Sequence, residues 1–174
     1  LAFNKPRGVI CTTDTNVRDN IIDAVAFPQR VFNIGRLDVM TEGLILLTNM
    51  GDIVNRILRA HHRHEKEYEV QTVAALTDDQ IKSLRAGVKL EDGPSLPCRV
   101  HRKGTKTVRM ILVEGRNRQI RRMITAVGAD VVRLKRVRVM SITLGDLASG
   151  KWRQFTPKEV AALLQEIGLK GKKT

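Results

Sequence analysis

Apolar residues run together or alternate with polar residues in five short segments of the chain, and this spacing predicts strands. The segments are residues 31–37, 44–48, 67–73, 107–114 and 131–140. Several are rich in β-branched residues, which favour extended backbone. Helices and turns separate these segments without a strict strand-helix-strand alternation. The pattern therefore predicts an α+β fold with a mixed, mostly antiparallel central sheet flanked by helices.

Two helices are predicted from matching signals at both ends. Each begins with a Thr followed three residues later by Gln or Glu, which is the capping box, and each ends at a Gly that supplies a left-handed stop. The residues are Thr77, Gln80 and Gly87 in the first helix, and Thr156, Pro157, Glu159 and Gly168 in the second. The apolar stripe of the second helix is Val160, Leu163, Leu164 and Ile167. Two less distinct helices are expected at residues 18–26 and, after the cap Asp52, at residues 53–60.

The composition adds a strong positive charge to this picture. The chain has 174 residues and a formal net charge of +13, a field that attracts polyanions, so nucleic acid is the first partner to test. No stretch approaches the roughly 20 apolar residues of a spanning helix, and the first ten residues do not resemble a signal peptide. We expect a soluble cytoplasmic protein with one domain at residues 1–169 and a short basic tail at residues 170–174.

The cysteines and histidines do not form a metal-binding pattern. Cys11 and Cys98 lie far apart, so we expect two buried or idle thiols and neither a zinc site nor a disulfide. The crowded histidines His61, His62 and His64 lack acidic or thiol co-ligands nearby, which favours a solvated loop over a metal site. A metal nuclease is also disfavoured, because its site needs clustered carboxylates and the acids of this chain are dispersed.

The most informative segment is residues 33–49, which predicts a strand, a polar turn and a second strand. Arg36, Asp38, Thr41 and Glu42 cluster in the turn between apolar runs. Side chains held at the mouth of a rigid sheet are often catalytic. The alternative from patterning alone is a hairpin loop in which Asp and Thr bond only to their own backbone.

Four segments, in order, resemble those of pseudouridine synthases, in particular the group that acts on small- and large-subunit ribosomal RNA. Residues 35–38, Gly-Arg-Leu-Asp, with Thr41, Gly43 and the run ending in Leu-Thr-Asn at 47–49, resemble the catalytic signature. Residues 4–8 resemble the opening strand and turn, residues 66–70 the tyrosine-bearing strand, and residues 114–123 the arginine motif. Met50 departs from the polar residue that many relatives carry there, and we expect only a local effect on the turn.

The resemblance implies that Asp38, Tyr68 and Arg121 are catalytic and that no cofactor or metal is used. Asp38 would act at the ribose and free the uracil, which turns and rejoins through C5. Because burial disfavours a charged carboxylate, a cation has to compensate, and the family's arginine matches Arg121. Tyr68 would stack on the everted base and assist proton transfer at C5, although a ring in an alternating strand is most often core.

Arg121 also follows from the helical spacing of its segment. If Asn117 caps a helix, apolar residues at the i, i+3, i+4, i+7 spacing form its buried face. They are Ile120, Met123, Ile124 and Val127. Arg121 then lies at the boundary of that face and can reach inward, whereas Arg118 and Arg122 point away from the core.

A set of cations is expected to bind RNA. Arg36, by analogy with relatives, would fill the place vacated by the everted nucleotide, and a phosphate contact is the alternative. The other members are Lys5, Arg7, Arg116, Arg118, Arg122, Arg133, Lys135, Arg136 and Arg138. A charge run is often simply solvated, and this alternative stays open for all of them.

Two hypotheses about function remain. The first is an RNA-modifying enzyme that acts as a monomer on large-subunit ribosomal RNA, with transfer RNA as a second substrate. The rival is a non-catalytic RNA-binding or ribosome-assembly domain, which would not need the set Asp38, Tyr68 and Arg121. Since the chain begins with Leu, and relatives often carry a small S4-type RNA-binding domain at the amino terminus, we expect such a module upstream.

Overall fold

The computed structural model describes residues 1–58 and 64–169, and these form two compact units. Of the described residues, the first unit contains 1–58 and 136–169, and the second contains 64–135. Strand β9, Val131–Val139, runs through the division between them. The end of the helix predicted at residues 53–60, the histidines His61 and His62, and the predicted tail all lie outside the described residues.

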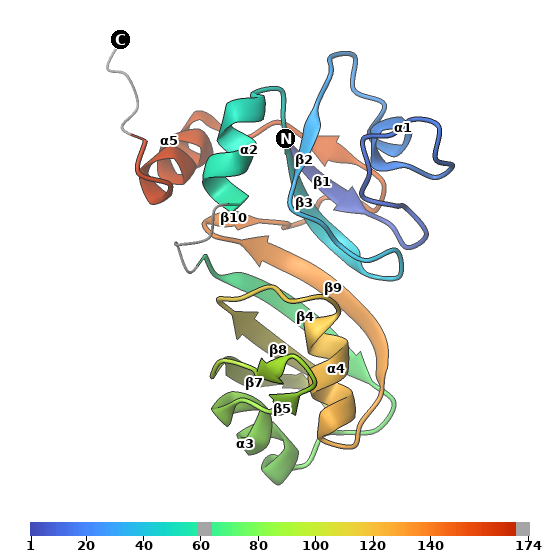
Figure 1. Cartoon of the computed structure of the whole chain (residues 1–174), viewed down its shortest axis with the longest axis vertical. Helices are drawn as coiled ribbons and strands as arrows, with labels where there is room; N and C mark the ends of the chain where they lie inside the picture. Colours follow the sequence, from blue (N-terminus) through green and yellow to red (C-terminus); the bar gives the residue numbers. More distant parts are fainter. Residues whose placement is uncertain (59–63, 170–174) are drawn as a thin grey trace. The chain divides into compact units, whose positions relative to one another are not determined.

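Antiparallel pairs of strands form the sheet of the first unit (Figure 1). Its strands are β1 (Ala2–Lys5), β2 (Phe32–Ile34), β3 (Glu42–Thr48), β10 (Ile142–Thr143) and β11 (Trp152–Arg153). β1 lies between β11 and β3, β2 pairs with the end of β3, and β10 pairs with the end of β9. The predicted order of strand, turn and strand over residues 33–49 is therefore confirmed as the β2–β3 pair.

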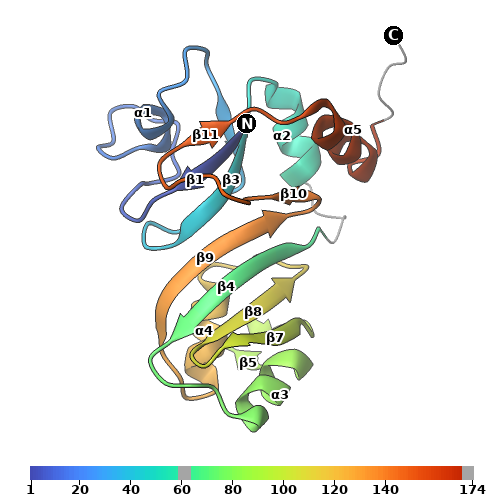
Figure 2. The same ribbon diagram turned by 180° about the vertical axis from the view of Figure 1, so that it is seen from behind.

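The core of the first unit lies where the sheet meets its helices. The helices are α1 (Ile21–Val25), α2 (Gly51–Leu58) and α5 (Pro157–Glu166). Ile57 of α2 and Leu163 of α5 belong to one buried cluster with Leu44 and Leu46 of β3. Both ribbon views show α2 and α5 side by side (Figures 1 and 2). Burial of these apolar side chains is what holds the two helices in place.

The second unit is an antiparallel sheet with helices on one face. Strand β8 (Thr107–Leu112) lies between β4 (Lys66–Thr72) and β7 (Arg99–Gly104), and every second residue of β8 is buried. These buried residues pack against α3 (Asp78–Ala86) and α4 (Gln119–Ala126). Figure 2 shows the sheet in front of α4, so its other face is open.

The open face carries ion pairs instead of apolar side chains. Arg109 bridges Glu67 and Glu69 with distances of 2.8 and 3.2 Å, and Lys103 contacts Glu69 at 2.7 Å. The two cations hold the pKa of Glu69 below its ordinary value, although burial acts in the opposite direction. Acids and bases therefore balance across this face, which makes it a poor phosphate-binding surface.

The two capping boxes are confirmed. Thr77 and Thr156 each accept a bond from the amide three residues later, and the Gln80 and Glu159 side chains each accept from the cap amide. Glu159 also accepts from Arg153, which lowers the pKa of its carboxyl group to about 2. A hairpin of β5 (Lys89–Leu90) and β6 (Gly93–Pro94) follows α3.

Several predicted element ends were wrong. α1 begins only after Asn20, whose side chain accepts from the Asp23 amide, and α2 begins at Gly51, so Asp52 lies in the first turn and is not a cap. Gly87 has φ 93° and ψ 147°, which is not the left-handed helical conformation. Val160 is 42% exposed, so the buried stripe of α5 is narrower than predicted.

Gly43 is the residue at which the first unit tolerates no side chain. Its φ is +107°, and a Cβ atom there would lie 2.2 Å from the carbonyl oxygen of Arg136. Arg136 is buried, and its Nε donates to the Leu44 carbonyl oxygen at 2.7 Å, so its backbone cannot easily move away. The close approach of the two backbones thus depends on glycine.

We predict that Gly43→Ala lowers the free energy of unfolding by more than about 2 kcal/mol, because backbone strain and a steric overlap act together. Gly93→Ala is the matched control, since Gly93 has φ +104° but open space around its Cβ position. Chemical unfolding of both variants measures the difference. If the two substitutions cost the same, the overlap with Arg136 has no energetic weight.

Candidate active site

Asp38 lies at the start of a tight turn between β2 and β3. The Asp38 carbonyl oxygen accepts from the Thr41 amide at 3.0 Å, so Asp38 and Thr41 are the first and last residues of a β-turn. Thr41 is buried, Asp38 is half-buried, and Val39 and Met40 at the tip are 41% and 51% exposed. The turn thus fixes the backbone of Asp38 while leaving its side chain partly accessible.

The two-residue spacing of Arg36 and Asp38 would place both side chains on one face if the strand predicted at residues 31–37 continued to Asp38, and this expectation was wrong. β2 ends at Ile34, Gly35 has φ +76°, and neither Arg36 nor Asp38 lies in a strand. The positive φ of Gly35 redirects the chain and breaks the period of two on which the argument depended. Arg36 is exposed, and this leaves its guanidinium accessible to a polyanion.

The ammonium group of Lys5 braces the turn from inside the unit. Lys5 is fully buried, and its Nζ donates to the carbonyl oxygens of Pro6, Val9 and Val39 at 3.0, 2.8 and 3.3 Å. Burial lowers the pKa of Lys5, while the neighbouring Cys11, Asp38 and Glu42 oppose that shift. The prediction that Lys5 binds RNA is contradicted, because its donors are used inside the fold.

Two further bonds tie the same turn to the segment after β1. The Gly8 amide donates to the Val39 carbonyl oxygen at 2.8 Å, and the Leu37 amide donates to Cys11 Sγ at 3.4 Å. Cys11 is buried as predicted, but it accepts a bond next to Asp38, so it is not an idle thiol. The residues on both sides of Asp38 are therefore held by one neighbouring segment.

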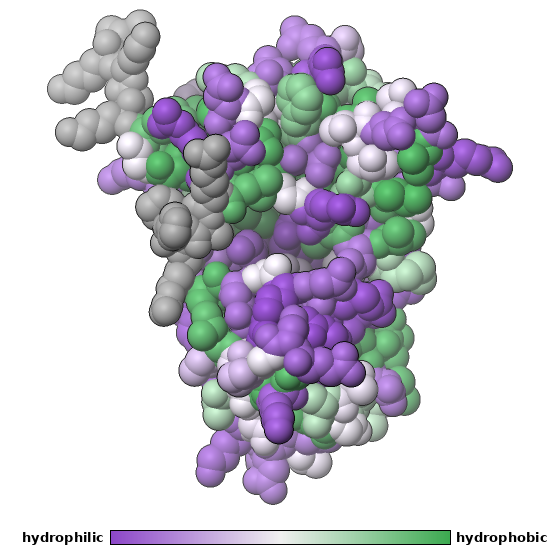
Figure 3. All heavy atoms as spheres, viewed as in Figure 1, coloured by the Kyte–Doolittle hydropathy of each residue, from purple (hydrophilic) through white to green (hydrophobic). Residues whose placement is uncertain are grey.

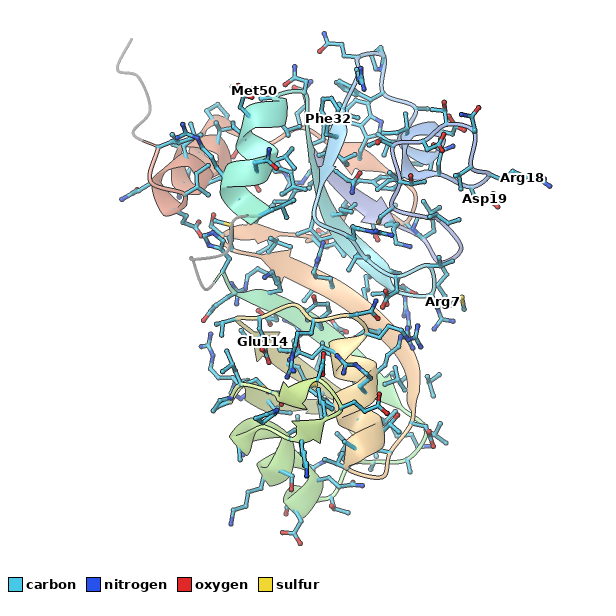
Figure 4. The ribbon with its side chains drawn as sticks, viewed as in Figure 1. Arg7, Arg18, Asp19, Phe32, Met50 and Glu114 are labelled. Carbon is cyan, nitrogen blue, oxygen red and sulfur yellow. The ribbon has the colours of Figure 1, made fainter. Side chains whose placement is uncertain are left out.

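Arg7, on the turn that follows β1, is a partly exposed cation close to Glu42 of β3. Arg7 Nε is 3.5 Å from Glu42 Oε2, with the Arg7 side chain 41% exposed and that of Glu42 15% exposed. Figure 4 labels Arg7 on the turn that follows β1. Arg7 therefore combines an ion pair with accessible surface, which suits a contact with a polyanion.

Tyr68 and Arg121 belong to the second unit. Tyr68 pairs with Met110 of β8 and packs, partly buried, against the core cluster that includes Ile120 and Met123 of α4. Arg121 is half-buried in the first turn of α4. The buried face predicted for this helix is confirmed for Ile120, Met123 and Ile124, while Val127 is the partly buried C-cap.

The start of α4 differs from the prediction. Asn117 does not cap the helix, because the N-cap is Arg118 in a left-handed conformation with φ 48° and no side-chain cap bond. The Asn117 carbonyl oxygen instead accepts from Arg122 Nε at 2.9 Å. Gln119, which is 5% exposed, accepts from the Arg116 amide at 3.0 Å, so this buried side chain closes the loop in place of a cap.

The arginines of this motif have different environments. Arg118 is exposed, whereas Arg116 and Arg122 are partly covered and paired with Asp92 at 3.1 and 2.7 Å. Glu114, labelled in Figure 4, lies in the loop before α4 and is 3.6 Å from Arg116. Figure 3 shows hydrophilic side chains gathered over this loop and the first turn of α4.

The cation run at residues 133–138 is divided between surface and interior. Arg133 is exposed and Lys135 half-buried. Arg138 is half-buried and donates to the Met140 carbonyl oxygen at 2.8 Å. Arg136 is 5% exposed and donates to Leu44, which contradicts its predicted place in an RNA track. Strand geometry explains this, since alternate residues face opposite sides.

Neither a metal cluster nor a membrane helix is found in the part of the chain that the structure describes. Over residues 1–58 and 64–169, His, Cys, Asp and Glu form no group of three suited to a metal ion. None of the helices within these ranges has the length and apolar character to cross a bilayer.

The sequence and the structure both match known RNA-modifying proteins. Residues 1–126 match the family described as RNA pseudouridylate synthase. The chain belongs to this family. A crystal structure described as pseudouridylate synthase superposes on the chain with a TM-score of 0.85 and 31% identity, covering 93% of this chain and 72% of that one. The mixed, mostly antiparallel sheet with helices is thus the pseudouridine synthase fold.

Curated relatives in the pseudouridine synthase family include proteins with large-subunit names. The "Dual-specificity RNA pseudouridine synthase RluF" of Salmonella typhi is 44% identical over 167 residues, covering 96% of this chain and 58% of the relative. The "Ribosomal large subunit pseudouridine synthase B" of Bacillus subtilis is 36% identical, covering 91% of this chain and 68% of the relative. The chain spans 58% of the length of the first of these relatives.

Sequence reasoning missed two residues that brace the candidate site. Cys11 and Asp92 contact the elements that carry the predicted catalytic residues, yet no local pattern distinguishes them. Their partners are distant in sequence, since Leu37 follows Cys11 by 26 positions and Arg122 follows Asp92 by 30. The contact between the Gln119 side chain and the Arg116 amide could have been predicted, because the two residues lie three positions apart, as in a capping box.

We predict that Lys5→Met lowers the free energy of unfolding by about 2 kcal/mol or more, because three carbonyl oxygens lose their charged donor. Lys151→Met removes the same charge from an exposed lysine of the same unit and is the matched control. Urea unfolding followed by circular dichroism measures both. Equal midpoints for the two variants would contradict a bracing role for Lys5.

Proposed function

We propose that this chain isomerises uridine to pseudouridine within structured RNA and that the carboxylate of Asp38 is the reacting group. The observation that carries the proposal is the bracing of Asp38: Lys5, Gly8 and Cys11 hold the backbone on both sides of a half-buried acid. A fixed charge at an accessible turn is what preorganised catalysis requires. A domain that only binds RNA does not need an acid fixed at an accessible turn.

The proposed reaction moves one bond and needs no cofactor. Asp38 acts at the ribose, the bond from C1′ to N1 breaks, and the freed uracil turns so that C5 bonds to C1′. The proton on C5 is then removed and N1 gains one, so substrate and product have the same atoms. The target nucleotide has to leave the RNA stack first, since a base inside a helix is out of reach.

Tyr68 and Arg121 of the second unit complete the proposed catalytic set. We propose that Arg121 keeps the Asp38 carboxylate charged and that Tyr68 stacks on the everted uracil and assists the proton transfer at C5. The half-buried positions of both side chains support this, because each is partly accessible and Tyr68 also packs against the core of the second unit.

The proposed substrate is large-subunit ribosomal RNA, with transfer RNA as a second substrate. The large-subunit name of a relative from Bacillus subtilis and the dual-specificity name of the relative from Salmonella typhi support this choice. The net charge of +13 supports a polyanionic substrate. The proposed RNA contacts are the cations with accessible surface, Arg7, Arg36, Arg118, Arg133 and Lys135.

We predict that Asp38→Asn abolishes pseudouridine formation and largely keeps RNA affinity, because one uncharged side chain replaces the reacting group without altering the cations. Pseudouridine is detected by chemical labelling after incubation with ribosomal RNA, and affinity by filter binding. Normal turnover by the variant would remove Asp38 from the mechanism. Absence of activity in the unmodified chain, with RNA still bound, would favour the non-catalytic alternative.

We predict that Arg121→Met and Lys135→Ala, which each remove one positive charge, have different effects. Arg121→Met lowers turnover more than binding, because it removes the compensating cation of Asp38. Lys135→Ala mainly weakens RNA binding and reduces the slope of log affinity against log salt by about one. Single-turnover rates and affinities at several salt concentrations distinguish them. Equal losses of affinity alone from both variants would contradict the two assignments.

A further inference from the structure

One acid outside the proposed catalytic set binds two arginines of the arginine motif. Asp92 lies in the turn between β5 and β6, with its side chain 48% exposed. Arg122 contacts it at two points, with Nη1 2.7 Å from Oδ1 and Nη2 3.1 Å from Oδ2. A guanidinium that donates to both oxygens of a carboxylate is fixed in orientation as well as distance.

Arg116 attaches the same hairpin to the loop before α4. Its Nη1 donates to Asp92 Oδ1 at 3.1 Å and to the carbonyl oxygens of Asp92 and Gly93 at 3.1 and 3.0 Å. The hydrogen bond from Arg122, with Arg116 acting in the same direction, lowers the pKa of Asp92, and Asp92 raises the pKa of Arg122. Asp92, Arg116 and Arg122 thus form one cluster, which we term the Asp92 latch.

The first turn of α4 depends on contacts of this kind. Its N-cap, Arg118, is left-handed and supplies no side-chain bond, so the first turn lacks the usual side-chain capping acceptor, and the Gln119 amide donates to the Arg116 carbonyl oxygen at 3.1 Å. The loop is held instead by Gln119, which donates to Glu114, and by Glu114, which accepts from the Leu96 amide at 2.8 Å. Arg116 and Arg122, on either side of this turn, join it to the hairpin.

We propose that Asp92 is a positioning residue for Arg121. The proposal rests on the catalytic role proposed above for Arg121. Arg121 is the neighbour of Arg122 in the first turn of α4, so the latch fixes the backbone from which the Arg121 side chain extends. Arg116 and Arg122 then serve the geometry of the second unit, and the exposed Arg118 is the cation of this motif that is left for phosphate.

The competing interpretation makes Arg116 and Arg122 direct phosphate ligands, with Asp92 as an internal competitor of RNA. The two interpretations predict different effects of removing Asp92 on RNA affinity and on turnover. If Asp92 competes with RNA, its removal frees two guanidinium groups, which raises affinity and steepens the salt dependence without lowering turnover. If Asp92 positions Arg121, removal of Asp92 lowers turnover. RNA affinity then changes only as much as it does when another nearby acid is removed.

The experiment compares three variants of the full chain with the unmodified protein. Asp92→Asn removes the latch charge at nearly constant shape, Asp92→Glu restores a carboxylate, and Glu91→Gln makes the same charge change at the neighbouring exposed acid. We expect Asp92→Asn to lower kcat by about tenfold with KM within about twofold, because a small displacement of a catalytic group is costly. Asp92→Glu recovers most of the rate, and Glu91→Gln keeps the kcat of the unmodified protein.

The salt dependence of RNA binding supplies the readout that is independent of activity. We expect Asp92→Asn and Glu91→Gln to have equal slopes of log affinity against log salt. Unchanged kcat in Asp92→Asn, or a steeper slope than in Glu91→Gln, overturns the proposal. Loss of kcat without recovery in Asp92→Glu overturns it too. An inactive unmodified chain would count against the proposed function, whereas an active chain indifferent to Asp92→Asn would count against the latch alone.

Discussion

The buried ammonium of Lys5 is the constraint on which the first unit depends. A charged group with no exposed surface is tolerated only when its donors are satisfied, and here three backbone carbonyl oxygens satisfy them. These carbonyls belong to the end of β1, the following loop and the turn of Asp38. The position of the Asp38 turn thus depends on the hydrogen bonds of Lys5, which lies far from it in sequence.

The positive charge of the chain has two separate uses. Some cations hold the fold together: Arg85 donates to the Val100 carbonyl oxygen, Arg136 to that of Leu44, and Arg153 to Glu159. Others, such as Arg36 and Arg118, are exposed. The net charge of +13 therefore favours a polyanionic partner but overstates the number of side chains that can contact it. Counting basic residues cannot separate these roles, because burial is decided by distant contacts.

Local patterns predicted the fold wherever neighbouring residues alone decide the conformation. Strands β4, β8 and β9 and both capping boxes lie within two residues of their predicted bounds, because alternation and capping act over a few residues. β7 was missed, since its side chains are largely polar and are held by pairs such as Arg102 with Asp78. The left-handed Arg118 was missed too, because a positive φ in arginine has no sequence signal.

In the candidate site, too, local patterns predicted the turn but not the contacts with residues distant in sequence. The sequence placed Asp38 in a turn between two strands, and the structure agrees, but the contacts that fix the turn come from Lys5, Gly8 and Cys11. The Asp92 contacts with the arginine motif have the same character. In both units a charged side chain fixes the backbone next to a proposed catalytic group: the buried Lys5 in the first unit and the partly exposed Asp92 in the second. Such bracing makes sense for a group that has to be in place before its substrate arrives, because reorganisation during the reaction would raise the barrier.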